Sequence, residues 1–253
     1  MKILFLGDIV GSHGCRFVRS KIFDIKKQYN IDTVIVNGEN SADGNGITPA
    51  SADMLSFADV ITTGNHCFRR KEMMKRYDEP CNVIRPANYP EGAPGKGVYI
   101  HDMGSARLAV INLMGTVYLE ALDNPFTVID RILEDIDTPN ILVDFHAEAT
   151  SEKKAMGQYL AGRVTAVIGT HTHVQTADET ILSGHTAYIT DAGMCGAELS
   201  VLGVKSELAI NKMKTHLPVK FAESDNPPFL NGVIIEYDKK NGKALSVERI
   251  ILR

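Results

Sequence analysis

Short apolar runs alternate with amphipathic segments along the first third of the chain. Three mainly apolar runs have the length of a strand: Ile3–Leu6, Thr33–Val36 and Val60–Thr62. The segments around them carry apolar residues at helical spacing, which predicts helices over residues 14–29, 49–57 and 69–77 and a further short strand at 83–84. Strand and helix in alternation predict a largely parallel sheet with helices on its faces.

The remaining two thirds are richer in strands. Two pairs of apolar runs flank turn-like residues and predict hairpins: 98–102 with 108–113, and 231–237 with 245–252 across Asn241-Gly242. Other strands are expected at 141–145, 164–168 and 186–190, and helices near 125–135 and 152–161. No linker or internal repeat divides the sequence, so we expect one domain over residues 1–253, with two packed sheets and outer helices.

Charge and composition limit the kinds of ligand and partner that the protein is expected to bind. The 253 residues include 27 basic and 31 acidic side chains, a net charge of −4, and no basic block. This argues against binding to duplex DNA by neutralising phosphates, although a small phosphorylated ligand is compatible with it. The first apolar run is too short for a signal peptide or a membrane span, and four scattered cysteines are typical of reduced thiols. We therefore expect a cytoplasmic protein that does not bind membranes.

Side chains that bind metals follow the predicted strands. His171 and His173 come after the run at 164–168, and two residues spaced in this way on an extended chain point to the same side. Other candidates stand at the ends of other apolar runs: Asp8, Glu39, Asn40, Asn65, His66 and His146. The carboxyl ends of parallel strands are where α/β sheets bind ligands. The pattern predicts one site assembled from most of the chain.

Each candidate also has an ordinary structural explanation. Asp8 could cap a helix, Asn65 could stand in a turn, and His146 could be a satisfied core histidine. Burying so many polar groups without a compensating charge would cost roughly 1–3 kcal/mol for each group. Two carboxylates, three imidazoles and two amides are too many for one tetrahedral zinc, and suit two metal ions of higher coordination number. Nitrogen and oxygen ligands without thiolate favour manganese, iron or zinc.

Two residues and one loop near these motifs have two interpretations each. Cys67, beside His66, could be a ligand but is better explained as a small buried hydrophobe. Arg85, in a turn-rich loop, could steer an anion or form a surface salt bridge. The loop 41–49 ends in Thr48 and Pro49, which are typical of a helix N-cap and first helical position, and the loop could also line a substrate pocket.

The candidate motifs resemble those of the calcineurin-like metallophosphoesterases: Gly7-Asp8, Gly38-Glu39-Asn40, Gly64-Asn65-His66, His146 and Gly169-Thr170-His171-Thr172-His173. Within that superfamily the chain most resembles the bacterial YmdB-type proteins, which are 2′,3′-cyclic-nucleotide 2′-phosphodiesterase-like enzymes. The resemblance runs nearly end to end, and includes Arg85-Pro86-Ala87-Asn88-Tyr89 and Asp191-Ala192-Gly193-Met194. It implies a four-layer α/β/β/α sandwich.

The chain departs from the wider superfamily at the first metal. Most members open with Asp-x-His, whereas Asp8 is followed here by Ile9 and Val10, and Glu39 stands where a bridging Asp is usual. The resemblance implies that Asn40 takes the vacant position. It assigns Asp8, Glu39, Asn40 and His173 to one metal, and Glu39, Asn65, His146 and His171 to the other. Iron or manganese are the expected ions, with zinc as an alternative.

The resemblance also implies a reaction. A hydroxide that bridges the two metals attacks phosphorus in line, and His66 protonates the leaving alkoxide. The alternative for His66 is a structural residue that hydrogen-bonds a ligand. The expected substrates are 2′,3′-cyclic nucleotides or similar small phosphodiesters. Two other functions stay open: a phosphomonoesterase or protein phosphatase with the same metals, and a metal-dependent regulatory protein that binds a nucleotide or RNA. A homo-oligomer is compatible with each.

Overall fold

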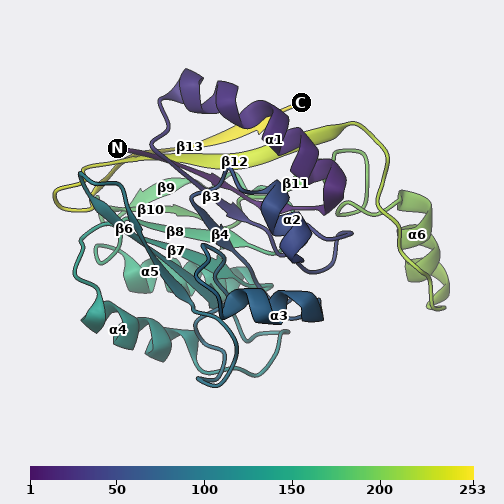
Figure 1. The fold of residues 1–253 in the computed structure, drawn as a ribbon, viewed down its shortest axis with the longest axis horizontal. Coiled ribbons are helices and arrows are strands. Elements are labelled where there is room, and N and C mark those ends of the chain that lie inside the picture. Colours follow the sequence, from purple (N-terminus) through teal and green to yellow (C-terminus); the bar gives the residue numbers. More distant parts are fainter.

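A computed structural model of the chain, which describes residues 1–253, shows a mixed α/β fold with two sheets (Figure 1). The first sheet contains β1 (Lys2–Leu6), β2 (Asp8–Ile9), β3 (Thr33–Asn37), β4 (Val60–Thr62), β11 (Met194–Ala197), β12 (Pro228–Tyr237) and β13 (Ala244–Leu252). β1, β3 and β4 run parallel, and β12 lies antiparallel to β1 on its other side. β12 also pairs with β11 and β13.

The second sheet has the order β5-β6-β7-β8-β10-β9. Its strands are β5 (Val98–Asp102), β6 (Arg107–Met114), β7 (Ile141–His146), β8 (Ala166–Thr170), β9 (Thr180–Leu182) and β10 (Thr186–Ile189). The four central strands are parallel, and the two edge strands are antiparallel to their neighbours. The carboxyl ends of β6, β7 and β8 therefore reach the same edge.

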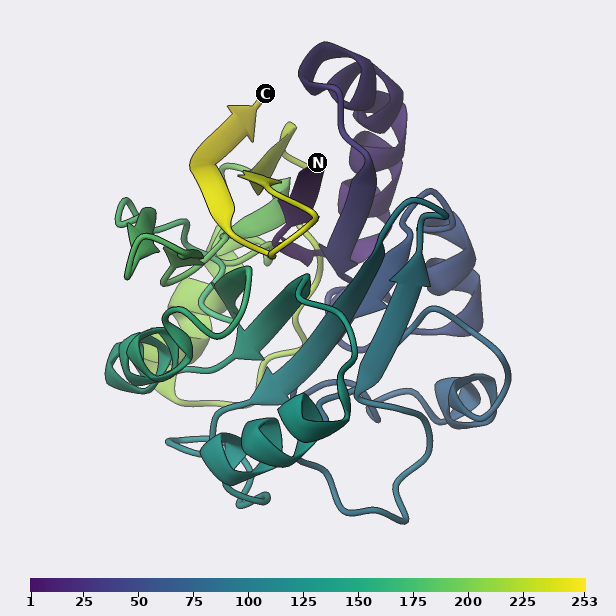
Figure 2. The same cartoon turned by 90° about the vertical axis from the view of Figure 1, so that its left-hand side faces the viewer.

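Six helices accompany the sheets: α1 (Gly11–Tyr29), α2 (Pro49–Met54), α3 (Lys71–Tyr77), α4 (Pro125–Asp135), α5 (Thr150–Leu160) and α6 (Ser206–Thr215). α1 and α2 lie beside the first sheet, and α4 and α5 lie on the far side of the second (Figures 1 and 2). α6 stands apart from both sheets (Figure 1), and only Ala209 of this helix is buried. None of these helices combines the length and apolar character that a bilayer span requires.

Alternating side chains divide the core into layers. In β1, Ile3 and Phe5 belong to a cluster that also contains second-sheet residues such as Val110. Leu4 and Leu6 point the other way and pack with α1. A third cluster joins the outer face of the second sheet to α4 and α5. Each fully buried large apolar side chain stabilises the fold by about 1.5–3 kcal/mol. Because side chains alternate between the two faces of a strand, the positions of the apolar residues determine which layer each face packs against.

The structure confirms the order of the main elements and both hairpins, and α4 has the predicted bounds. Thr48 caps α2, accepting a hydrogen bond of 3.1 Å from the Ser51 backbone N–H, and Pro49 is the first helical residue. The predicted parallel arrangement of β1, β3 and β4 is confirmed. The complete first sheet is mixed, because β12 pairs antiparallel with β1. Residues 83–84 form only an isolated bridge to Ile61 instead of a strand.

Several element boundaries also differ. α1 begins at Gly11, three residues before the predicted start, because the Gly11 N–H is held by the Asn40 carbonyl at 2.9 Å. The short strands β2, β9 and β11 and the helix α6 were not predicted. β2 and β11 are too short and too poor in β-branched residues for a periodic signal, and α6 buries almost no apolar face.

Candidate metal centre

The structure brings all eight predicted site residues to one edge of the molecule. Asp8 begins β2, the pairs Glu39–Asn40 and Asn65–His66 follow β3 and β4, His146 ends β7, and His171 and His173 follow β8. Parallel strands end at a common edge, so residues far apart in sequence become neighbours there. Hydrogen-bond distances link these side chains into two overlapping groups.

The first group meets at His146. Its Nε2 atom lies 3.2 Å from Glu39 Oε1, 3.0 Å from Asn65 Oδ1 and 3.0 Å from His171 Nδ1. The candidate ligand atoms of Glu39, His146 and His171 all lie within 4.8 Å of one another. These four residues are the set that the resemblance assigns to the second metal.

The second group shares Glu39 Oε1. Asn40 Nδ2 lies 3.3 Å from that oxygen, 3.4 Å from Asp8 Oδ1 and 3.1 Å from His173 Nε2. Here the amide nitrogen of Asn40 faces the other three groups. A half-turn of the amide would bring its oxygen to face them instead, the orientation in which Asn40 can bind a metal. Glu39 therefore touches both predicted ligand sets with one oxygen.

His66 lies beside both groups without joining either set. Its backbone N–H donates to Glu39 Oε2 at 3.0 Å, and its Nδ1 lies 2.8 Å from Asn40 Oδ1. When the Asn40 amide turns its oxygen to the ligand groups, its N–H donates to His66 Nδ1, and the neutral ring carries its proton on Nε2, which has no protein partner. The side chain is 25% exposed, whereas that of His146 is fully buried. His66 can therefore exchange a proton with a bound ligand at Nε2.

Charge and burial within the cluster favour the metal-binding forms of Glu39 and His171 but the protonated form of His146, which would release a proton on binding a metal. Burial alone would raise the pKa of Glu39, but His146 and His66 hold it well below its usual range. Burial would lower the pKa of His146, but Glu39 and Asp8 raise it to about 9. Burial and the nearby His146 lower the pKa of His171 to about 3. A carboxylate and a neutral imidazole are the forms in which these side chains bind metals.

A buried polar layer orients His146 from below. Asp144 Oδ1 accepts a hydrogen bond of 2.7 Å from the Thr170 hydroxyl, whose oxygen lies 2.9 Å from His146 Nδ1. In its neutral form, His146 then carries its proton on Nδ1 and presents the Nε2 lone pair to the site. Asn37 donates to Asp144 Oδ2 at 3.1 Å, and burial raises the pKa of Asp144 to about 7. Sequence reasoning missed this layer, although Asp144 is an isolated charged residue in an apolar strand.

His171 has a corresponding partner at the surface. Its Nε2 lies 2.9 Å from Glu148 Oε2, a half-exposed carboxylate. Because Nδ1 faces His146, this carboxylate fixes Nε2 as the protonated nitrogen of a neutral ring. Glu148 was also missed, since it follows β7 in a loop and stands outside every motif.

The backbone at His171 and His173 is strained. His171 has φ 106° and His173 has φ 64°, in the left-handed region that side chains rarely adopt. Such residues cost roughly 1–3 kcal/mol each and persist where the surroundings hold them. The Asp8 carboxylate is one restraint, because Oδ2 accepts a hydrogen bond of 3.1 Å from the His171 N–H.

Gly64 gives the site its space. A Cβ atom at this position would lie 2.2 Å from His146 Cδ2 and 2.4 Å from Glu39 Oε2. We expect Gly64→Ala to displace both side chains, to destabilise the protein by about 1–3 kcal/mol and to weaken metal binding. Thermal unfolding and metal titration of the variant check this, with Gly92→Ala as the control because nothing lies within 4 Å of that Cβ. Normal metal binding by Gly64→Ala would contradict the observed packing.

Two of the other sequence interpretations are now decided. Both alternatives for Arg85 were wrong: the side chain is buried and donates to main-chain oxygens, including that of Pro86 at 2.8 Å. Cys67 is a fully buried core residue, as expected.

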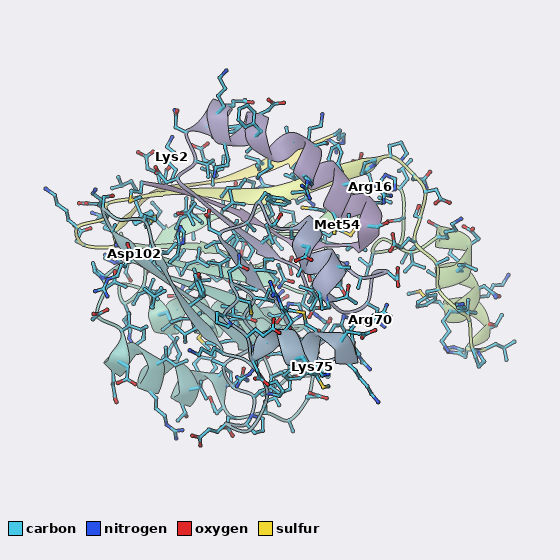
Figure 3. All side chains as sticks on the ribbon, in the orientation of Figure 1. Lys2, Arg16, Met54, Arg70, Lys75 and Asp102 are labelled. Atoms are coloured by element: carbon cyan, nitrogen blue, oxygen red, sulfur yellow. The ribbon has the colours of Figure 1, made fainter.

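Arg70, at the beginning of α3 (Figure 3), was missed by the sequence analysis. It donates to the Asn45 and Ala42 carbonyls at 2.9 and 3.1 Å, and so holds the loop that follows Asn40.

The donor set fits divalent metal ions. In the first group, lone pairs of a carboxylate, an amide oxygen and two imidazole nitrogens converge with few protons to share between them. Glu39 and His146 are buried, so water does not solvate the carboxylate charge and a cation would compensate it. Mixed nitrogen and oxygen ligands suit transition metals better than calcium or magnesium. Fold and site together define a two-sheet α/β protein with a candidate metal centre at the carboxyl edge of its strands.

Comparison with known proteins agrees with that class. The family model for YmdB-like proteins matches residues 4–250. The chain is 47% identical over 256 residues to the 2′,3′-cyclic-nucleotide 2′-phosphodiesterase of Bacillus subtilis strain 168, covering all of this chain and 97% of that protein. The chain therefore belongs to the YmdB-like protein family.

Solved structures give the same result. A crystal structure of a novel phosphatase from Mycoplasma pneumoniae superposes with a TM-score of 0.94 at 34% identity, covering all of this chain and 93% of that one. A structure described as a 5′-nucleotidase from Staphylococcus aureus superposes with a TM-score of 0.60 at 16% identity, covering 99% of this chain and 54% of that one. This second likeness shows a shared fold alone.

Proposed function

We propose that this protein is a metal-dependent phosphodiesterase that hydrolyses 2′,3′-cyclic nucleotides or similar small phosphodiesters. The observation that carries the proposal is the position of Glu39 Oε1, which lies 3.2 Å from His146 Nε2 and 3.3 Å from Asn40 Nδ2 and so joins two ligand groups. A shared carboxylate can hold two metal ions close together, as catalytic two-metal sites do. The phosphodiesterase activity named for the Bacillus relative supports the reaction class.

The ligand assignment follows the two groups. Asp8, Glu39, Asn40 and His173 would hold one ion, and Glu39, Asn65, His146 and His171 would hold the other. Iron or manganese suit these ligands, with zinc as an alternative. When bound, such ions activate water as a nucleophile near neutral pH and neutralise charge on phosphoryl oxygens. The Asp144–Thr170 pair and Glu148 keep the imidazoles of His146 and His171 in the tautomers that bind metal.

His66 is the proposed general acid. With the Asn40 oxygen on a metal, the amide N–H would donate to His66 Nδ1 and leave the ring proton on Nε2, which has no protein partner. Partial exposure lets this nitrogen meet the leaving oxygen of a bound ester and transfer a proton to it. His66, the side chain that can donate a proton, thus lies next to both ligand sets without belonging to either.

The surrounding fold supports the same proposal. Three apolar clusters separate helices, sheet, sheet and helices, as in the four-layer α/β/β/α sandwich of the superfamily. The ligands come from residues 8–173 and the first sheet closes with β12 and β13, which supports a single domain over 1–253. The four cysteines are free thiols, which supports a cytoplasmic location.

Product analysis tests the substrate. With added Mn²⁺, we expect 2′,3′-cyclic mononucleotides to be opened at the 2′ ester, giving 3′-mononucleotides, and duplex DNA to be neither bound tightly nor cut. Two metals can hold a single phosphodiester without a basic groove, and the chain of net charge −4 has no basic block for a long polyanion. Chromatography against both isomeric products checks this. Release of the 2′-mononucleotide would contradict the regiochemistry, and rapid monoester hydrolysis without diester turnover would favour a phosphatase.

A further inference from the structure

A buried carboxylate outside the candidate ligand sets holds the loop that carries His171 and His173. Asp191 Oδ2 accepts a hydrogen bond of 3.0 Å from the backbone N–H of Thr172 and one of 2.8 Å from its hydroxyl. Thr172 stands between His171 and His173, both of which have positive φ. The middle residue of the strained segment is therefore fixed at two points by one oxygen atom.

The same carboxylate is itself fixed by a lysine. Lys153 Nζ, from α5, lies 2.6 Å from Asp191 Oδ2, and each side chain is only 1% exposed. Asp191 Oδ1 accepts a further hydrogen bond of 2.8 Å from the Gly193 N–H. With four donors around two oxygens, the carboxylate has one available position. Lys153 itself makes no hydrogen bond to a candidate ligand.

The fold makes room for this lysine. At Gly169, on β8, a Cβ atom would lie 1.8 Å from the Thr190 carbonyl oxygen and 3.1 Å from Lys153 Cδ. The glycine lets the adjacent chains approach and lets the lysine stem pass beside the strand. The Lys153 ammonium group thereby lies next to the loop at residues 171–173, out of contact with solvent.

We propose that Lys153 and Asp191 are positioning residues that hold Thr172, and through it His171 and His173, in the geometry that binds metal. The inference rests on the proposed function, since it concerns the same metal centre. A buried ion pair contributes little to stability compared with an apolar pair of similar size, but it restricts the positions of the groups around it. Here those groups are the backbone and hydroxyl between two metal ligands.

Titration of the folded, metal-free protein with Mn²⁺ tests the inference. Asp191→Asn keeps the size of the side chain but removes its negative charge and replaces one accepting oxygen with an NH₂ group. We expect the Mn²⁺ affinity of this variant to fall about 10–100-fold. Thr172→Val keeps the backbone N–H and loses the hydroxyl, and we expect a smaller fall of about 10-fold or less. Lys154→Met is the matched control, because Lys154 is the next residue of α5 and pairs with Asp178 at the surface. The Mn²⁺ affinity of this variant should equal that of the unsubstituted protein.

A second measurement separates positioning from stability. Circular dichroism and thermal unfolding without metal report whether each variant is folded, and affinity is then expressed per folded molecule. Because the Asp191 and Thr172 substitutions break the same contact, their effects on Mn²⁺ affinity should be less than additive in the double variant. Should Asp191→Asn not fold, Thr172→Val and Lys153→Met carry the test.

The outcomes are distinct. Weaker Mn²⁺ binding by folded Asp191→Asn, with normal binding by Lys154→Met, supports the inference. Variants that lose thermal stability but bind Mn²⁺ like the unsubstituted protein would overturn it and leave the proposed function intact. No Mn²⁺ binding by the unsubstituted protein would overturn both.

Discussion

Glu39→Ala is expected to abolish metal retention and to lower phosphodiesterase activity by at least about 100-fold. The side chain is 1% exposed, and its Oε1 atom is the one oxygen within 3.3 Å of both ligand groups. Removing it deprives both ions of a ligand and of one negative charge. Elemental analysis should find more than one metal equivalent in the unsubstituted protein, purified without chelator, and close to none in the variant.

Two further variants define the result. Glu91→Ala removes an exposed carboxylate and should change neither metal content nor rate. Asn40→Ala should weaken mainly one of the two sites, because the amide contacts Asp8 and His173 but lies outside the group around His146. A Glu39→Ala protein that keeps both ions would exclude the bridging role, and full metal content and rate in Asn40→Ala would exclude Asn40 as a ligand.

His66→Ala is expected to keep its metals and to lose roughly 10²–10⁴-fold in rate. The backbone N–H that donates to Glu39 is unchanged by the substitution, so the ligand sets stay in place. The loss should shrink for esters of nitrophenol, because a good leaving group departs without a proton. Rates for good and poor leaving groups, measured at saturating Mn²⁺, check this.

A histidine elsewhere provides the control for His66. His101 lies on β5 beside Asp59, away from the ligand groups, and His101→Ala should leave the rate unchanged. An equal loss of rate by His66→Ala for both kinds of leaving group would show that His66 binds phosphate or supports the structure instead of donating a proton.

The candidate ligands could be predicted from the sequence because each follows a strand that has a clear apolar signal. His146, for example, ends a six-residue strand in which every residue is buried. Predicting the site did not require the order of the strands, because parallel strands end at a common edge. His146 of β7 and Glu39, which follows β3, meet although β7 and β3 belong to different sheets.

The supporting residues could not be predicted in this way. Asp191 and Lys153 lie 38 positions apart and meet only because α5 packs over β8, a contact that no local pattern encodes. Glu148 and Arg70 act from loop and helix-end positions where an exposed charged residue is the ordinary expectation. The antiparallel pairing of β1 with β12 also depends on the whole sheet, since strand propensity carries no information about the partner.

That pairing has a consequence for the order of folding. β1 leads directly to Asp8, yet β12, one of its two neighbours in the sheet, lies more than 220 residues later in the chain. During synthesis, β1 can pair only with β3 until residues 228–237 have been made. Contacts between such distant segments form late and slow the folding of a domain. β1, which leads to the candidate ligand Asp8, therefore gains its second neighbour only after residues 228–237 have been made, so the complete candidate centre forms late in folding.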